Sequence, residues 1–135
     1  MQHKPPSESQ FAKKFRKALG SQDIDYTQIV EGGTPGETDY IVRLPGGRSV
    51  YIELKCGSHP LEPEQRRKMT RMITEGHEAY VLRHIGTCVA LQKTPWPVRA
   101  VGVGADHATL RIQMLPESRS FDHINWRLFL FGYER

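Results

Sequence analysis

The stretch TDYIVRLPGGRSVYIELKCG, residues 38–57, alternates apolar and polar side chains on both sides of a Pro-Gly-Gly sequence. Alternation of this kind around a turn predicts a β-hairpin, with strands over 38–44 and 48–55. Three charged side chains stand where a plain hairpin would carry apolar or mixed polar ones: Asp39, Glu53 and Lys55. Their relative positions depend on the register of the hairpin.

The turn offers two registers. A two-residue Gly-Gly turn would pair Leu44 with Ser49, whereas a three-residue loop would pair Leu44 with Arg48. The sequence favours the three-residue loop, with Pro45 at the first corner of a type I turn and Gly47 in the left-handed bulge position. In that register one face of the hairpin is apolar, and it carries Tyr40, Val42, Val50, Ile52 and Leu54.

The opposite face then places Asp39 directly across from Glu53, with Lys55 two residues farther along the strand. Two like charges at opposed positions destabilise a sheet, so a neutralising partner is expected. A divalent cation such as Mg²⁺ takes carboxylate oxygens as ligands. Lys55 could then lower the pKa of a metal-bound water or steady the attacking hydroxide. The alternative is that Glu53 and Lys55 are exposed strand residues that form a weak pair.

A helix is predicted to begin at Ser7, where Gln10 can reach back to form a capping box, and to end at Gly20. Its apolar positions recur at helical spacing, at Phe11, Phe15, Ala18 and Leu19. Its basic face carries Lys13, Lys14, Arg16 and Lys17. We interpret Lys13, Lys14 and Lys17 as candidate DNA contacts, although a solvated helix face would have the same composition.

A second helix is predicted between Pro63, near its first turn, and Gly76, after its end. Its apolar stripe is formed by Met69, Met72 and Ile73, and Gln65 lies on the same stripe. This amide could bind a phosphate or the attacking water, or it could cap the helix's own N-terminus. A basic strip faces outward, made of Arg66, Arg67, Lys68 and Arg71, of which Arg66, Arg67 and Arg71 are candidate DNA contacts.

Strands are also expected at 24–30, before residue 83 and at 87–92, with a loop at 31–37 and another hairpin around Gly104 to His107. In the C-terminal tail, apolar side chains at helical spacing include Phe121, Ile124, Leu128 and Phe131, with Trp126 beside them. We expect residues 1–93 to form the core and residues 94–135 to form an extension. The extension would pack on the core or provide a homodimer surface.

Composition is that of an ordinary globular protein, since the chain has 135 residues, 38% hydrophobic and 25% charged. The net charge of +4 permits an anionic partner such as nucleic acid without requiring one. No apolar run suggests a membrane span or a signal peptide, so a cytoplasmic protein with reduced Cys56 and Cys88 is expected. The spacings Cys56-x-x-His59 and His84-x-x-x-Cys88 are weak patterns for zinc.

The hairpin, the LEPEQ sequence at 61–65 and the EGHEAYVLR sequence at 75–83 together resemble the PD-(D/E)XK nuclease superfamily, and most of all its small VRR-NUC type. The resemblance covers roughly residues 7 to 83. It implies a restriction-endonuclease-like α/β fold, a mixed β-sheet flanked by helices. It also implies a site, in which Asp39, Glu53 and the main-chain carbonyl of Leu54 are metal ligands, Lys55 is the catalytic lysine, Gln65 is the helix glutamine and Glu8 is the family's early acid.

By this resemblance the chain is expected to be an Mg²⁺- or Mn²⁺-dependent DNA endonuclease, with Holliday junctions or other branched DNA as candidate substrates. One such site serves one strand, so paired cuts would need a homodimer. A helicase or recombination partner could direct it, and the sequence names none. The alternatives are a catalytically inactive DNA-binding module or accessory protein, and a scaffold protein with a chance Glu-x-Lys.

Overall fold

The computed structural model describes residues 7–29, 39–57, 59–93, 119–121 and 124–131. In chain order its elements are α1 (Glu8–Ser21), β1 (Asp25–Gln28), β2 (Tyr40–Leu44), the 3₁₀ turn η1 (Pro45–Gly47), β3 (Arg48–Cys56), α2 (Pro63–Thr74), β4 (Glu78–Ile85), β5 (Cys88–Gln92), β6 (Arg119–Ser120) and α4 (Trp126–Phe131). The loop expected at 31–37 and the hairpin expected around Gly104 to His107 lie outside these residues.

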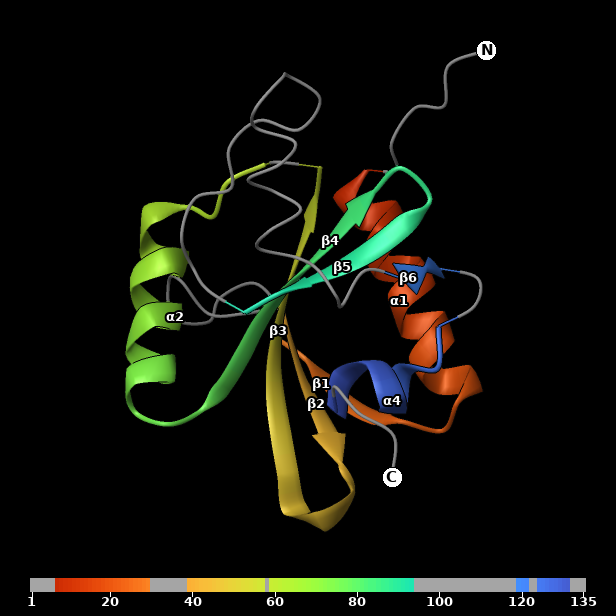
Figure 1. Ribbon diagram of the computed structural model, residues 1–135, viewed down its shortest axis with the longest axis horizontal. Coiled ribbons are helices and arrows are strands. Elements are labelled where there is room, and N and C mark those ends of the chain that lie inside the picture. Colours follow the sequence, from red (N-terminus) through yellow and green to blue (C-terminus); the bar gives the residue numbers. More distant parts are fainter. Residues whose placement is uncertain (1–6, 30–38, 58, 94–118, 122–123, 132–135) are drawn as a thin grey trace.

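The strands form one six-stranded sheet in the order β1-β2-β3-β4-β5-β6. β3 and β4 are parallel, because α2 crosses over between them, and the other neighbouring pairs are antiparallel. Figure 1 shows α2 on one side of the sheet and α1 with α4 on the other. The protein therefore has the predicted architecture, a mixed sheet with helices on both faces. None of the helices in the described ranges is both long enough and apolar enough to cross a membrane.

The capping box of α1 is present as predicted. Ser7 Oγ accepts from the backbone N–H of Gln10 at 3.2 Å, and Gln10 Oε1 accepts from the backbone N–H of Ser7 at 2.9 Å. The helix ends one residue later than expected, because Gly20 remains helical and Ser21 is the last helical residue. Its buried stripe rests on the sheet and consists of Phe11, Phe15 and Leu19.

The hairpin of β2 and β3 has the register that the three-residue loop predicts, with Leu44 opposite Arg48. The predicted turn type, type I, is wrong. Gly46 has φ 82° and ψ 14°, which is the third position of a type II turn rather than of a type I turn. Gly47 is also left-handed, at φ 76°. Because the loop holds two consecutive glycines, the chain can enter the left-handed region one residue earlier than expected.

Two apolar clusters cover the two faces of the sheet. The larger one lies under α1 and α4 and includes the predicted hairpin face of Tyr40, Val42, Val50, Ile52 and Leu54. The smaller one lies under α2 and contains Leu61, Met69, Met72, Ala79 and Val81. Ile73 is not part of it: this side chain is 37% exposed, so the predicted stripe of α2 is narrower by one residue. Ile73 sits next to Met72, which occupies the inward position.

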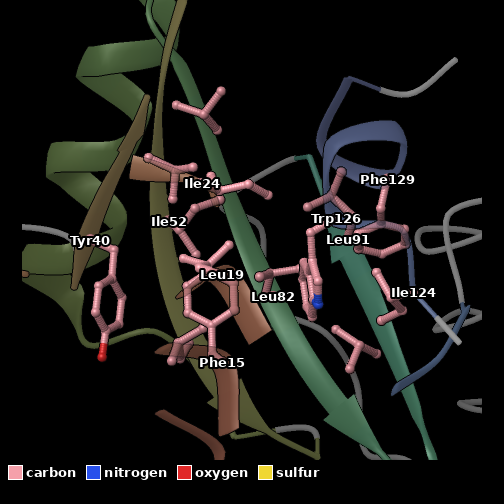
Figure 2. Packing of buried hydrophobic residues seen from close by; sticks show 14 of the residues in the cluster. Phe15, Leu19, Ile24, Tyr40, Ile52, Leu82, Leu91, Ile124, Trp126 and Phe129 are labelled. Atoms are coloured by element: carbon pink, nitrogen blue, oxygen red, sulfur yellow. The ribbon is translucent and has the colours of Figure 1, made fainter. Parts of the chain in front are cut away.

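The C-terminal tail completes the larger cluster. The rings of Phe15 and Trp126 lie 5.1 Å apart, edge to face, and Ile124 and Phe129 are buried beside them (Figure 2). The side chain of Gln22 ties the tail to the end of α1, because its Nε2 donates to the carbonyl of Ile124 and its Oε1 accepts from the backbone N–H of Trp126, both at 2.8 Å.

For two residues of the tail these contacts favour packing on the core, one of the two alternatives expected for it. Ile124 and Trp126 are 5% and 1% exposed within a single chain. Large apolar side chains that the chain already buries in its own core cannot bury the same area against a second copy. A dimer would therefore gain little from these two side chains.

Candidate active site

The two predicted acids of the hairpin lie together at the end of β2 and the middle of β3. The last pair of the ladder is Tyr40 with Ile52, so the next position places Asp39 across from Glu53. Asp39 is fixed by a hydrogen bond from the backbone N–H of Leu54 to its Oδ2, at 2.8 Å. This contact lays the carboxylate of Asp39 against the main chain of Leu54, the residue expected to supply a carbonyl ligand.

Glu53 is nearly inaccessible, with 3% of its surface exposed. The pKa of Glu53 is raised to about 9, mainly by burial and then by the neighbouring charge of Asp39, while the charge of Lys55 opposes the rise. Within the described residues, Oε1 of Glu53 has no hydrogen-bond donor. A buried carboxylate oxygen without a donor, beside a second carboxylate, needs a proton or a cation.

Lys55 lies on the same face of β3 and is 4% exposed. Its Nζ is 4.0 Å from Oε2 of Glu53 and 3.9 Å from Oε1 of Glu8, at the start of α1. The alternative interpretation, an exposed pair on the strand surface, is therefore wrong for both Glu53 and Lys55. Lys55 thus lies buried between two acidic side chains, in a position where an ammonium group without a partner would be costly.

Gln65 caps its helix, as one of the two sequence interpretations proposed, and it also contacts Glu53. Its Oε1 accepts from the backbone N–H of Glu62 at 2.8 Å, which caps α2. Its Nε2 donates to Oε2 of Glu53 at 2.9 Å, which orients that carboxylate. The helix glutamine thus reaches the site through Glu53.

The oxygens gathered here suit a hard divalent cation. Asp39 and Glu53 supply two carboxylates beside the main chain of Leu54, and Oε1 of Glu53 still lacks a partner, so these residues fit Mg²⁺ or Mn²⁺. No group of three or more His, Cys, Asp or Glu side chains in the described ranges could hold a metal ion. Glu8 instead contacts Lys55 and, at 3.6 Å, Nδ1 of His59. Glu8 is thus a partner of Lys55 in this structure, and its role as a third acidic ligand stays a prediction.

The candidate DNA contacts lie outside this cluster. On α1, Lys13, Lys14 and Lys17 are exposed, and Nζ of Lys14 lies 5.2 Å from the centre of the Phe121 ring. On α2, Arg67 pairs with Glu64 at 2.6 Å and Arg71 pairs with Glu75 at 3.4 Å, while Arg66 is partly buried. Exposed pairs of this kind add little stability, so these side chains remain available to a phosphate backbone.

Sequence reasoning missed Arg83, which is fully buried on β4 beside Lys55 in the parallel register. Its guanidinium donates to the carbonyls of Gly57 and His59 at 3.1 and 2.6 Å, and to Oε1 of Gln92 at 2.6 Å. Burial lowers the pKa of Arg83 to about 10. The hydrogen bonds of Arg83 hold Gly57 and His59, which follow Lys55 in the chain. In the sequence, its only indication was a basic residue among the mostly apolar side chains of β4.

Arg16 was also misplaced, because it was grouped with the lysines of α1. It follows Glu8 by eight residues and Ala12 by four, a spacing that puts all three on one line along the helix. In the structure Arg16 is partly buried, and its Nη1 donates to the hydroxyl of Tyr40 at 2.8 Å. The i, i+4, i+8 spacing from Glu8 was the signal that could have assigned it to the site.

The chain is similar to a curated nuclease over part of its sequence and to two solved structures in its fold. No family model matches the chain. Over 55 residues it is 33% identical to "Putative nuclease p44" of Acyrthosiphon pisum secondary endosymbiont phage 1, a match that covers 41% of this chain and 59% of that protein. The chain therefore spans about three fifths of the length of this curated relative.

Two solved structures share the fold. A VRR_NUC domain has a TM-score of 0.50 at 22% identity, and the match covers 58% of this chain and 83% of that one. The Holliday junction resolvase Hjc of Archaeoglobus fulgidus has a TM-score of 0.53 at 16% identity, over 78% of this chain and 93% of that one. The resemblance noted in the sequence is thus confirmed in the fold: the chain has the restriction-endonuclease-like α/β fold of the VRR_NUC domain and of the archaeal resolvase.

Proposed function

We propose that this protein is a metal-dependent DNA endonuclease that hydrolyses phosphodiester bonds at the Asp39–Glu53–Lys55 site. The observation that carries the proposal is the buried carboxylate of Glu53. It faces Asp39, has one oxygen without a donor among the described residues, and lies 4.0 Å from a buried lysine. Such an arrangement is costly for folding alone, and costly polar clusters are typical of functional sites.

Asp39, Glu53 and the carbonyl of Leu54 would hold Mg²⁺ or Mn²⁺. When bound, the ion would activate a water and neutralise charge that develops on the phosphoryl oxygens. Lys55 lies beside Glu53, where its ammonium group can stabilise the attacking hydroxide and the developing negative charge. Gln65 holds the Glu53 carboxylate in one orientation through Oε2, and Oε1, which has no donor among the described residues, would be available to the ion. The hydrogen bond from Leu54 does the same for Asp39.

The alternative, an inactive DNA-binding module, is less well supported. A module that had lost catalysis would have no reason to keep a buried lysine among acids, since well-packed apolar residues are often at least as stable there. Among substrates, branched DNA is the class we propose, because a solved structure of the same fold is named a Holliday junction resolvase. We propose branched DNA as the substrate and the cytoplasm as the location of the protein.

We also propose that paired cuts require two copies of the chain. Each chain offers one Asp39–Glu53–Lys55 set in its described part, and two-fold symmetry would present two sets to opposite strands. Light scattering with and without a four-way junction tests this. A mass that stays near 15.4 kDa in both conditions rules out a dimer of this chain.

The test of the main proposal is a cleavage panel. Linear duplex, nicked duplex, flap, single-stranded and four-way junction DNAs are incubated with the purified protein in Mg²⁺, in Mn²⁺ and in EDTA. We expect metal-dependent cuts, with branched DNA preferred. Asp39→Asn should reduce cleavage by about a hundredfold or more while the protein still folds and binds DNA. Cleavage by Asp39→Asn at the wild-type rate would refute the site.

A further inference from the structure

A pocket of about 300 Å³ opens next to the carboxylate of Asp39. It lies between the first half of α1, the end of β1 and the start of β2. Its walls are formed by Glu8, Ser9, Ala12, Arg16, Gln28, Ile29, Asp39, Tyr40 and Leu54. Asp39 and Leu54, two of the proposed metal ligands, belong to this lining, whereas Glu53 and Lys55 do not, so the pocket opens onto the proposed site of hydrolysis from the side of α1.

Arg16 is the one basic side chain among the described residues of this pocket. The hydroxyl of Tyr40 holds it in place, accepting from Nη1 at 2.8 Å. Tyr40 is itself 1% exposed, and Figure 2 shows it at the edge of the core cluster with its hydroxyl directed away from the buried side chains. This contact fixes the guanidinium in the wall of a pocket that Asp39 also lines.

Within the described part of the chain, no carboxylate neutralises the charge of Arg16. Its hydrogen bond to Tyr40 uses one of five N–H donors, and no ion pair there joins it to Glu8 or Asp39. The nearby basic residues of α1 differ, since Lys13 and Lys17 are exposed and do not line the pocket. A fixed guanidinium with unused donors, next to a site of phosphodiester hydrolysis, suits a phosphate oxygen pair.

We propose that this pocket binds the phosphate next to the scissile one on the cleaved DNA strand, and that Arg16 is its ligand. This inference rests on the proposed nuclease function, which assigns the scissile phosphate to Asp39, Glu53 and Lys55. The pocket volume is at the small end of ligand pockets, so it has room for a phosphate with its sugar and not for a duplex. Arg16 would thus set the register of the strand on the metal site.

The test neutralises one phosphate at a time. A DNA substrate carrying a single methylphosphonate at each position around the cut is cleaved under single-turnover conditions by the wild type, by Arg16→Gln and by Arg43→Gln. Arg43 is an exposed residue of β2 that pairs with Asp25 and does not line the pocket, so Arg43→Gln removes the same charge elsewhere. We expect the wild type to lose about tenfold at one phosphate beside the cut, as is typical for a lost charged hydrogen bond.

The Arg16→Gln variant should be about tenfold slower on unmodified DNA and should show no further loss at that phosphate, whereas Arg43→Gln should keep the wild-type profile. Tyr40→Phe, which keeps the buried ring and removes only the acceptor, should give a partial version of the Arg16→Gln profile. An unchanged methylphosphonate profile in Arg16→Gln overturns the proposal. If Arg16→Gln does not fold, Arg16→Lys keeps the charge without the fork and should lose part of the coupling; a wild-type profile in it overturns the proposal equally.

The same scan is repeated as equilibrium binding by fluorescence anisotropy in EDTA, where no cleavage occurs. Coupling between Arg16 and one phosphate in binding, with no cleavage in any metal, would refute the nuclease proposal and support the phosphate site. Cleavage without coupling in either assay would refute the phosphate site and leave the nuclease standing. Coupling in both the binding assay and the cleavage assay supports both the phosphate site and the nuclease function.

Discussion

Gln65 joins the first turn of α2 to the carboxylate of Glu53, donating from Nε2 at 2.9 Å while its Oε1 accepts from the backbone of Glu62 at 2.8 Å. Gln10 makes the same kind of cap at the start of α1, where its Oε1 accepts from the backbone of Ser7 at 2.9 Å. Gln10 is exposed and is absent from the Asp39–Glu53–Lys55 site. Gln10 therefore caps its helix without contacting the site, whereas Gln65 caps its helix and also orients Glu53.

Replacing each glutamine with alanine should separate the two roles experimentally. Both variants lose a capping hydrogen bond, so urea unfolding should show a loss of about 0.5–1.5 kcal/mol in each. Only Gln65→Ala should also slow single-turnover cleavage, by about 10- to 100-fold, because the orientation of Glu53 is lost. Equal cleavage rates in Gln65→Ala and Gln10→Ala would reduce Gln65 to a helix cap.

Lys55→Ala should lower turnover by about a hundredfold, because a fixed positive charge beside the reacting groups is removed. Metal affinity should change far less, since the lysine is not a ligand. Calorimetric titration with Mn²⁺, alongside single-turnover cleavage at saturating metal, measures the two effects separately. Lys93→Ala, at an exposed lysine directly after β5, is the control for charge. Lost Mn²⁺ affinity with normal turnover at saturation would assign Lys55 the opposite role.

The stability of the metal-free protein should fall as the pH rises from about 5 to about 9. The pKa of Glu53 is raised from its ordinary value of 4.5 to about 9, so between these values the folded state binds a proton that the unfolded state has released. The slope from this one group approaches about 1.4 kcal/mol per pH unit. Urea unfolding in EDTA across this range measures it, with Glu53→Gln as the variant that removes the proton.

The difference between wild type and Glu53→Gln isolates this group from the histidines. It should shift in favour of the variant with rising pH, and adding Mn²⁺ to the wild type should flatten its pH dependence, since a cation favours the charged carboxylate. A wild type that gains stability over Glu53→Gln as the pH rises would contradict the burial of this acid.

Trp126→Ala should destabilise the single chain by about 3–5 kcal/mol, as expected for truncating a fully buried aromatic residue. Its molecular mass by light scattering should not change. Leu128→Ala, at a partly buried position of the same helix, should cost less. A Trp126→Ala protein of normal stability that shifts from dimer to monomer would restore the tail as a dimer surface.

Local patterns were sufficient to predict the hairpin and its acids. The alternation of side chains in β2 and β3 permits only the register that keeps Val42 and Val50 inside, and that register alone brings Asp39 to Glu53. Capping was predictable for the same reason, because Ser7 and Gln10 are three residues apart and act within one turn.

Contacts between distant segments were not predictable in this way. The bonds from Gln22 to Ile124 and Trp126 span more than a hundred residues, and no periodicity within α1 or the tail specifies them. Likewise the pocket beside Asp39 combines one side of α1 with the ends of two strands, so Arg16 could be assigned only after these elements were placed. Arg16 was grouped with the lysines of α1 because of its charge, although its position on the helix differs from theirs.

The ties between Gln22 and the tail have a consequence for the order of events during synthesis. A growing chain can make the β2–β3–β4 sheet with α1 early, but the ring of Phe15 gains its Trp126 neighbour only after residue 126 has left the ribosome. Until then the nascent protein exposes an apolar strip of α1 and an open edge of β5, both of which are sites for chaperone binding or misassembly. Docking of the tail on α1 joins residues more than a hundred positions apart, and contacts of such high sequence separation are the ones that a folding chain makes late.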